Sequence, residues 1–391
     1  MKAQIITDYA KPSELKLDWD LPAFDPKSDQ VMVRLKSASM NRGDYTMRSG
    51  AAKSFISMQF PCILGKEGSG VVERVGEKVN SIQVGDEVVG VFGDLIKTGA
   101  YAEFAVFKEK EVVLKPKSLD FDHASIIPGI GMTIVEMCRS HDWILPIIER
   151  EADRVSLGQE LTPEYEESEK KSLTIVVIGA SSGTGCMAVL FAKNFLSRYF
   201  NTKVIAVCSE RNSTFAREQL GADGVIDYTK TSAAFGNNTF HSGDEKLSIF
   251  QTLKKDFKID FVDMVMDCVG GYYYYDDLTR HLKCCTDDGR RTYHVAIAPP
   301  GPLELSYSTV PAIVWYILKN KFKSWWSAQN PYYFFFSTSP DNPRIMKFLA
   351  SEQFSPIFEK IPITSFSLED YQKADDLMAS QRTVGKIVIN M

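Results

Sequence analysis

The sequence predicts an α/β protein in which a mostly antiparallel β-unit precedes a doubly wound parallel sheet. Up to about residue 120, short runs of alternating apolar and polar residues are separated by glycine-rich turns, which is typical of antiparallel strands. From Leu173, short apolar runs alternate with segments of helical period. Strands that are buried on both faces and joined by helices form parallel sheets.

The antiparallel unit is predicted to begin with a strand in residues 1–12. Its further strands are expected at VMVRLKSASM (31–40), GSGVVERVG (68–76), GDEVVGVFG (85–93) and AYAEFAVFKEKEVVLKPKSL (100–119). A helix is expected from about Gly131, where the apolar period lengthens toward 3.6. Residues 148–172 are rich in Glu and Lys and are interpreted as a solvated insertion, with an acidic docking surface as the alternative.

The parallel sheet is predicted from a series of short apolar runs. They are LTIVVIGA (173–180), KVIAVCS (203–209), GVIDY (224–228), FVDMVMDCVGG (261–271), RTYHVAIAPP (291–300) and, at the sheet edge, PYYFFFSTS (331–339). Helices are expected at 181–196, up to Leu220, at 246–256 and at 275–284, and the tail from residue 358 returns to strand, helix and strand. The edge strand invites pairing across a two-fold axis, so we expect a homodimer.

Composition excludes several classes of function. A formal net charge of -5 argues against nucleic-acid binding, because proteins that bind phosphate backbones carry a basic face. Seven cysteines without a CxxC pair, and five histidines without HExxH or HxxEH spacing, indicate neither a disulfide framework nor a metal site. Residues 1–12 lack the apolar core of a signal peptide, so we predict a cytoplasmic protein, or a mitochondrial one if a presequence has been removed.

One apolar segment raises the question of a membrane. Residues 310–326, VPAIVWYILKNKFKSWW, are too short in their apolar part for a spanning helix, which needs roughly 20 residues. With three lysines beside two tryptophans, the segment is compatible with peripheral contact at a membrane surface. A pocket wall or a subunit contact is the alternative interpretation.

The strongest chemical signal is GASSGTG (179–185), where the first strand of the parallel sheet leads into a helix. Glycines there let the backbone approach a pyrophosphate, and the helix N-terminus supplies N–H donors. A simple tight turn is the alternative, because the spacing is not GxGxxG. The candidate contacts are Ser181, Ser182, Gly183, Thr184 and Gly185.

The end of the next strand favours NADPH over NADH. NAD-binding folds place an acidic residue there, but this position falls to Cys208 or Ser209. A neutral residue does not repel a 2′-phosphate, and Arg211 is available to pair with one. Glu210 argues the other way, since an inward-facing carboxylate at this point would favour NADH.

Several motifs together resemble one known family. They are MNRGDYTMRSG (40–50), FPCILGKEGSGVVERVG (60–76), VGDEVVG (84–90), GAYAEFAV (99–106), IGASSGTGCMAVLFAK (178–193), LGADGVIDY (220–228), DCVGG (267–271) and GKIVINM (385–391). The chain resembles the medium-chain dehydrogenase/reductase superfamily, and within it the zinc-independent quinone oxidoreductase branch that includes the mitochondrial reticulon-4-interacting protein type. The resemblance implies a GroES-like catalytic domain at 1–125, a Rossmann domain at 126–340 with the insertion at 148–172, and a C-terminal segment at 341–391 that returns to the catalytic domain.

The resemblance also bears on metal binding. Zinc alcohol dehydrogenases of this superfamily carry a histidine ligand in a GHE turn and a cysteine ligand ahead of a conserved aspartate. This chain has Lys66 and Asn41 at the corresponding places, and neither is a good zinc ligand. The resemblance therefore implies a zinc-free site, in which Lys66 is exposed to solvent or contacts Glu67 or a substrate.

Without a metal to polarise a carbonyl, hydride transfer to a quinone or an α,β-unsaturated carbonyl is the reaction that the resemblance implies. It places Asn41 beside the nicotinamide ribose and Tyr45 in the substrate cleft, where Tyr45 is either a proton donor or a packed tyrosine. Further cofactor contacts that the resemblance implies are Thr133, Tyr228, Cys268, Ala296, Arg382, Thr383 and Val384. Phe334 and Phe336 are expected to border the nicotinamide cleft if 331–339 is the edge strand, with packing in the sheet or in a dimer as the alternative. Two other interpretations stay open: an NADPH-binding sensor or membrane-associated scaffold with little turnover, and a zinc-dependent alcohol dehydrogenase.

Overall fold

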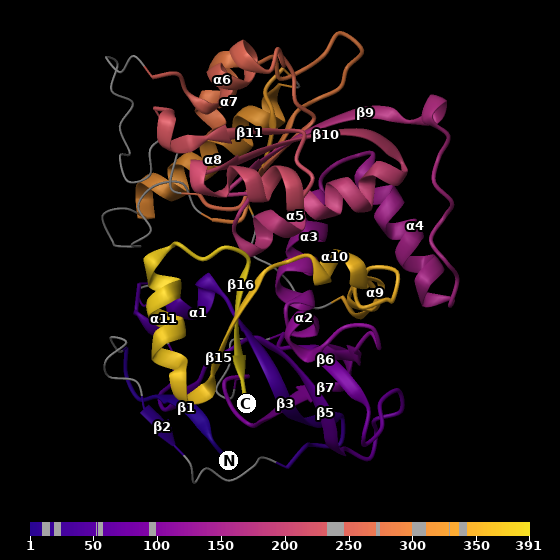
Figure 1. Ribbon diagram of the computed structural model, residues 1–391, viewed down its shortest axis with the longest axis vertical. Coiled ribbons are helices and arrows are strands. Elements are labelled where there is room, and N and C mark those ends of the chain that lie inside the picture. The colour runs from indigo at the N-terminus through magenta and orange to yellow at the C-terminus, as the bar shows by residue number, and fades with distance from the viewer. Residues whose placement is uncertain are drawn as a thin grey trace. The chain divides into compact units, whose positions relative to one another are not determined.

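The computed structural model describes two compact units (Figure 1). The described residues are 1–9, 16–18, 25–51, 53, 58–93, 99–232, 246–270, 274–298, 310–327, 329–335 and 342–391. The first unit comprises Met1–Thr133, Ile147–Leu161 and Thr338–Met391, and the second comprises Ile134–Pro146 and Thr162–Ser337. Predicted contact Phe336 lies outside the described residues.

The first unit is built on a mainly antiparallel sheet. In the described residues the strand order is β15 (Ile363–Ser367), β16 (Lys386–Asn390), β3 (Gln30–Met40), β5 (Glu67–Val75), β6 (Glu87–Val91) and β8 (Val112–Leu114), with β7 (Phe104–Lys108) also paired to β3. Only β15 and β16 pair in parallel. A smaller sheet joins β2 (Lys16–Asp18), β1 (Ala3–Ile6) and β4 (Cys62–Ile63). The predicted antiparallel unit is confirmed.

Helices complete this unit, and its core lies between them and the larger sheet. They are α1 (Arg42–Arg48), α2 (Phe121–Ser125), the π-helical turn Ile127–Gly131, most of α4 (Ile144–Ser156), α9 (Pro343–Leu349), α10 (Ser355–Glu359) and α11 (Tyr371–Ser380). Apolar side chains of β3, β7, β16 and α11 share one buried cluster. The C-terminal segment therefore closes the core of the unit that the N-terminal strands begin.

The predicted solvated insertion at 148–172 is only partly correct. Its first nine residues belong to α4, which buries Ile148, Glu151 and Ala152 completely. Arg344 of α9 pairs with two acidic side chains of α4, and Gln353 accepts a hydrogen bond from the backbone of residue 161 at 2.8 Å. The charged composition concealed the four-residue spacing of the apolar positions, which is the signature of a packed helix.

The second unit contains the predicted doubly wound sheet. In the described residues its parallel strands follow the order β11 (Gly224–Asp227), β10 (Phe200–Cys208), β9 (Lys171–Ile178), β12 (Met264–Asp267), β13 (Tyr293–Ala296) and β14 (Tyr332–Phe335). The order reverses between β9 and β12, which is where ligands bind in open α/β sheets. The predicted sixth strand is present at the edge.

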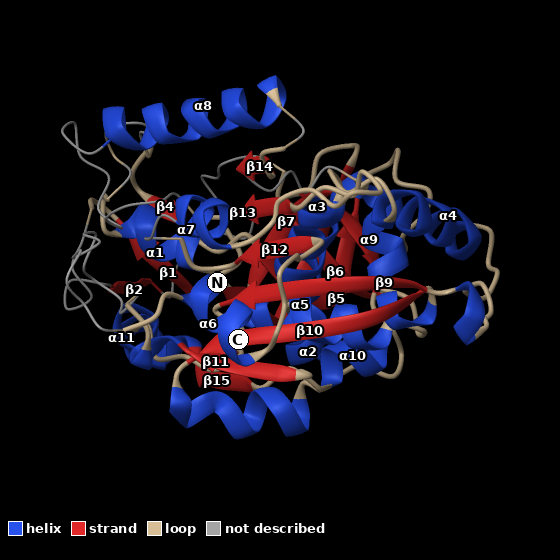
Figure 2. Ribbon diagram, turned by 90° about the horizontal axis from the view of Figure 1, so that it is seen from above, coloured by secondary structure: helices blue, strands red, loops and turns tan. Residues whose placement is uncertain are grey.

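Helices of the second unit are most of α3 (Met132–Cys138), α5 (Gly183–Asn194), α6 (Ile249–Asp256), α7 (Tyr274–His281) and α8 (Val310–Trp326). The helix expected up to Leu220 is present as short 3-10 and π turns, at Glu210–Asn212 and Phe215–Gln219. Figure 2 shows α8 along the side of β14 that faces away from β13. No helix in the described part of the chain has the length and apolar character needed to cross a membrane.

Candidate active site

The candidate functional residues form two groups, one in each unit. In the first unit, strand pairing brings together three segments that are distant in the sequence. Ser39 of β3 lies opposite Glu67 at the start of β5, and Met40 lies opposite Ile387 of β16. Asn41, which follows β3 and caps α1, is thereby placed near Glu67 and Lys386.

These three residues form a buried polar network. The Asn41 Nδ2 donates to Glu67 Oε1 at 2.8 Å, and Lys386 Nζ donates to Asn41 Oδ1 at 2.7 Å and to the Met40 carbonyl at 3.0 Å. The ammonium lies 3.6 Å from the same Glu67 oxygen. Glu67 is 0% exposed and Lys386 6%, so the half-buried amide of Asn41 is held between a buried carboxylate and a buried ammonium.

Gly129, in the π-helical turn, completes the surroundings of Glu67. Its backbone N–H donates to Glu67 Oε2, and a Cβ added at this glycine would collide with the carboxylate. The hydroxyl of Thr133 donates to the Gly129 carbonyl at 2.5 Å, so this predicted cofactor contact is buried one turn further along. The carboxylate thus has hydrogen-bond donors on both oxygens.

Asp44 adds a second buried carboxyl group. Its Oδ2 accepts from the backbone N–H of Asn41 and from the Tyr101 hydroxyl, each at 2.9 Å. Burial raises the pKa of Asp44 to about 6, although these two hydrogen bonds oppose the shift. Burial lowers the pKa of Lys386, and the charges of Glu67 and Asp44 partly restore it. Asp44 therefore becomes predominantly a carboxylate only above about pH 6.

Tyr45 on α1 is held by cations. The guanidinium carbons of Arg42 and Arg48 lie 4.7 Å and 5.0 Å from the centroid of its ring. Arg48 is itself buried and bonded to Asp375 of α11 at 2.8 Å, which fixes the position of one cation. The ring of Tyr45 is consequently oriented while the residue stays half-buried.

In the second unit, the strand register gathers the carboxyl ends of the parallel strands at one edge. Ile178, Cys208, Asp227, Asp267 and Ala296 lie there at the ends of β9 to β13. The glycine turn follows the first of these ends. The site is therefore built from the loops that leave neighbouring strands.

Close packing explains the glycines of this turn. Gly179 has φ +79°, and a Cβ there would strike the side chain of Val269. A Cβ at Gly185 would overlap the Gly179 carbonyl. Ser182 caps α5 by accepting from the Gly185 N–H at 3.1 Å, and Ser181 accepts from Asn212 Nδ2 at 3.0 Å. Gly183 and Thr184 begin the helix.

The ends of β10 and β11 decide the electrostatics of the next loop. The Glu210 side chain is 67% exposed and pairs with Lys230 at 2.8 Å, and Lys230 also lies 3.7 Å from Asp227. Ser209 caps the following turn and Arg211 is exposed. Glu210 thus faces solvent beside a cation and does not turn inward. Sequence reasoning missed Lys230, although it follows the quoted GVIDY motif by only two positions.

The end of β12 carries a tight turn. Asp267 Oδ1 accepts from the Val269 and Gly270 N–H groups at 3.1 Å and 2.9 Å, while burial raises its pKa to about 6. Burial also raises the pKa of the Cys268 thiol far above its ordinary value, so this side chain is a neutral thiol. Ala296 ends β13, where the next N–H donates to the Asp267 carbonyl at 3.1 Å.

Comparisons with known proteins agree with this architecture. Residues 27–117 match the family model of the alcohol dehydrogenase GroES-like domain, and residues 220–389 match that of zinc-binding dehydrogenase. The chain belongs to the medium-chain dehydrogenase/reductase superfamily. The relatives to which it is similar include proteins named quinone oxidoreductase.

Two relatives of this superfamily illustrate the similarity. A chloroplast envelope quinone oxidoreductase homolog of Arabidopsis thaliana is 32% identical over 214 residues, 55% of this chain and 57% of that protein. The mitochondrial NAD(P)H oxidoreductase RTN4IP1 of Mus musculus is 30% identical over 285 residues, 69% of this chain and 60% of that protein. The matched part therefore spans little more than half the length of these curated relatives.

Solved structures confirm the superfamily fold. The quinone oxidoreductase from Coxiella burnetii superposes with a TM-score of 0.68 at 22% identity, covering 100% of this chain and 99% of that chain. The Escherichia coli quinone oxidoreductase complexed with NADPH gives 0.67 at 19% identity, with 100% of both chains covered.

The residues at the superfamily's zinc positions do not fit a zinc ion. The side-chain oxygen of Asn41, Oδ1, is its only possible metal ligand, and it already accepts a hydrogen bond from the Lys386 ammonium. Lys66 ends in an ammonium group, which is a poor zinc ligand. Lys66 is half-buried, and within the described residues its side chain has no hydrogen bond or ion pair. The alternative contact between Lys66 and Glu67 is wrong, because Lys386 is the charge partner of Glu67.

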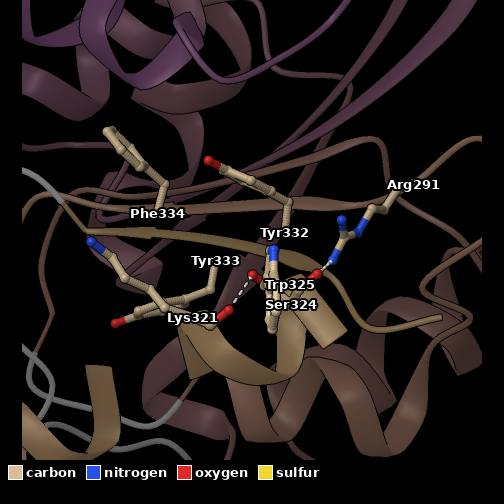
Figure 3. A pocket seen from close by; sticks show the side chains of 7 residues that line it. All are labelled: Arg291, Lys321, Ser324, Trp325, Tyr332, Tyr333 and Phe334. Atoms are coloured by element: carbon tan, nitrogen blue, oxygen red, sulfur yellow. Dashed lines mark hydrogen bonds between the residues drawn. The ribbon is translucent and has the colours of Figure 1, made fainter. Parts of the chain in front are cut away.

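The remaining predicted contacts are spread over both units. In the second unit, Tyr228 begins the turn after β11, and Phe334 lies in β14 beside a groove of about 350 Å³ between β14 and α8 (Figure 3). In the first unit, Arg382 is exposed, and Thr383 and Val384 are half-buried just after α11. Their roles toward a cofactor stay predictions.

Proposed function

We propose that this chain is an NADPH-dependent oxidoreductase that reduces quinones or α,β-unsaturated carbonyls. The observation that carries the proposal is the polar network of Asn41, Glu67 and Lys386, because Asn41 stands at one of the places where the resemblance puts a zinc ligand and is bonded there to a carboxylate and an ammonium. An acceptor that is already conjugated delocalises the negative charge that hydride addition creates, so it reacts without a metal Lewis acid.

The names of relatives support the choice of acceptor. One of them is an NADPH-dependent alkenal/one oxidoreductase of Arabidopsis thaliana, 31% identical over 235 residues, and another is a 2-methylene-furan-3-one reductase of Solanum lycopersicum, 30% identical over 235 residues. Quinones and enones share the conjugated carbonyl on which such reactions depend. We therefore assign the substrate to this chemical class.

The second unit fits a dinucleotide. The glycine turn leaves no room for side chains at Gly179 and Gly185, and Ser181 to Gly185 would hold the pyrophosphate. Ser209, Arg211, Tyr228 and Lys230 would surround a 2′-phosphate, and the exposed Glu210 already shares its charge with Lys230. NADPH supplies the hydride when bound. A preference for NADPH over NADH follows from these charges.

The polar residues of the first unit then fix the orientation of the Asn41 amide and of the Tyr45 ring. The Asn41 amide cannot rotate freely, because its nitrogen donates to a carboxylate and its oxygen accepts from an ammonium. We assign to Tyr45 the transfer of a proton from its hydroxyl to the reduced acceptor, because its ring is fixed between two guanidinium groups.

The test is the oxidation of NADPH, with NADH in parallel, against a panel of quinones and enals, with and without a strong zinc chelator. We expect turnover with NADPH that the chelator does not change. Turnover that the chelator abolishes would refute the zinc-free assignment. Binding of NADPH without turnover on any acceptor would instead identify a sensor or scaffold.

The homodimer also stays a proposal. In the described residues β14 pairs with β13 on one side, and α8 lies along its other side (Figure 2). Pairing of two β14 strands would therefore need access past α8. Light scattering after size-exclusion chromatography measures the mass, for which a dimer gives twice the chain mass of 43.9 kDa.

A further inference from the structure

Helix α8 exposes large apolar side chains to solvent and buries several polar ones. Six large apolar side chains on it are exposed: Val314 (46%), Trp315 (69%), Leu318 (57%), Phe322 (57%), Trp325 (78%) and Trp326 (73%). The side chains it buries include polar ones, at Tyr316, Asn320 and Ser324. A helix at the surface of a protein in water normally directs its apolar stripe inward, so the exposed apolar face of α8 indicates a binding surface.

The exposed residues lie on one continuous face. Their spacing, at 314, 315, 318, 322, 325 and 326, follows the helical period of 3.6. Phe322, Trp325 and Trp326 form an aromatic cluster at the C-terminal end, with ring centroids 5.7 to 6.5 Å apart. Three of the chain's five tryptophans lie on this face, which we call the α8 face. Tryptophan is enriched where water meets the lipid headgroups.

The fold holds this face outward. Arg291 donates to the carbonyls of Ser324 and Asn330, and Asn330 Nδ2 donates to the Lys323 carbonyl at 3.1 Å. These bonds tie the C-terminal end of α8 to the sheet. On the inner side, Tyr316 packs with Tyr275 and Tyr333. The helix therefore cannot turn its apolar side chains inward without losing these contacts.

The charged residues of α8 indicate what kind of surface binds there. Residues 310–326 contain Lys319, Lys321 and Lys323 and no acidic residue. By helical geometry Lys321 lies at one edge of the α8 face and the other two lie at the opposite edge. A cation-flanked apolar face rich in Trp and Phe is the signature of a helix that lies in the headgroup region of an anionic bilayer.

A second copy of the chain fits less well. Two α8 faces packed across a two-fold axis would bring six lysines together, and the helix has no carboxylate to neutralise them. An anionic lipid surface supplies the missing negative charge. We propose that α8 docks the protein on the surface of an anionic phospholipid bilayer, with the α8 face inserted among the headgroups and its three lysines at the phosphates.

The test uses the full chain and vesicles of phosphatidylcholine, with or without phosphatidylserine. We expect the protein to float with the anionic vesicles only, in a salt-dependent manner, and its tryptophan fluorescence to shift to shorter wavelength. Replacing all three lysines by Gln (K319Q/K321Q/K323Q) should weaken binding about 100-fold, from about fivefold per cation. Trp325→Ser with Trp326→Ser should weaken it at least as much, because the apolar contact is lost.

Matched controls separate this effect from general charge and from misfolding. The variant K254Q/K255Q/K258Q removes three lysines at and just after α6 and should bind the vesicles as the unmodified chain does. Circular dichroism and thermal unfolding establish that each variant is folded. Failure of the unmodified chain to bind anionic vesicles overturns the proposal, as does equal binding by the α8 variants. A dimer that Trp325→Ser with Trp326→Ser dissociates, without vesicle binding, would assign the face to a second copy.

Discussion

Lys386→Met is the most informative perturbation of the buried network. The substitution keeps the length and apolar stem of the side chain but removes the ammonium. Two hydrogen bonds are lost, at 2.7 Å to Asn41 Oδ1 and at 3.0 Å to the Met40 carbonyl, each contributing about 1 kcal/mol. Glu67, with none of its surface exposed, also loses its cation. We expect a loss of about 3–5 kcal/mol in the free energy of unfolding, the range for a buried charge left unpaired.

The measurement is equilibrium unfolding in denaturant, with a surface control and a paired variant. Lys347→Met on α9 removes an exposed cation of the same unit and should change stability by about 0.5 kcal/mol or less. The double variant of Glu67→Gln and Lys386→Met removes both charges, so it should be more stable than Lys386→Met alone. The reasoning is refuted if Lys386→Met costs no more than Lys347→Met, or if the double variant is less stable than the single one.

Further predictions concern titration, the cofactor and the reaction. Because burial raises the pKa of Asp44 to about 6, the folded state keeps a proton that the unfolded chain releases above pH about 4. This group's contribution to stability therefore falls as pH rises from about 4 to 6, by about 3 kcal/mol, and Asp44→Asn should remove that slope in the melting temperature. Gly185→Ala should weaken NADPH binding more than tenfold by fluorescence titration, since its Cβ would meet the Gly179 carbonyl. Lys230→Ala should raise the Kd for NADPH about tenfold and leave that for NADH unchanged; equal effects on both would disprove a 2′-phosphate contact. Tyr45→Phe should lower kcat about 100-fold if the hydroxyl donates a proton, and an unchanged kcat would leave only a packing role.

Local patterns predicted much of the fold. The strands of both sheets, the glycine turn and the edge strand are visible in short windows, because they depend on side-chain period and on glycine at a few crowded positions. Helix α4 was missed because its acidic and basic residues conceal the apolar pair Ile148 and Ala152. The ion pairs of Arg344 with α4 show that this stretch packs with residues nearly 200 positions away.

The candidate site was predicted unevenly for the same reason. Ser181, Ser182 and their neighbours follow one strand, so a single motif locates them. Lys230 was overlooked because its meaning depends on its contact with Glu210 across two strand ends. For Lys66, a contact with the neighbouring Glu67 was one of the alternatives, whereas the cation that pairs with Glu67 is Lys386.

The sequence by itself determined the two kinds of sheet and the glycine turn, and it placed Asn41 and Lys66 where the resemblance expects zinc ligands, since each depends on residues that are close together or on the chemistry of a single side chain. Only the tertiary structure decided which side chains surround Asn41 and which way α8 faces. The pairing of β16 with β3 brings Lys386 to a residue 345 positions earlier. The hydrogen bonds of Arg291 and the packing of Tyr316 hold α8 in an orientation that exposes its apolar side chains. Both outcomes depend on long-range contacts, whose partners cannot be identified from the local order of residues.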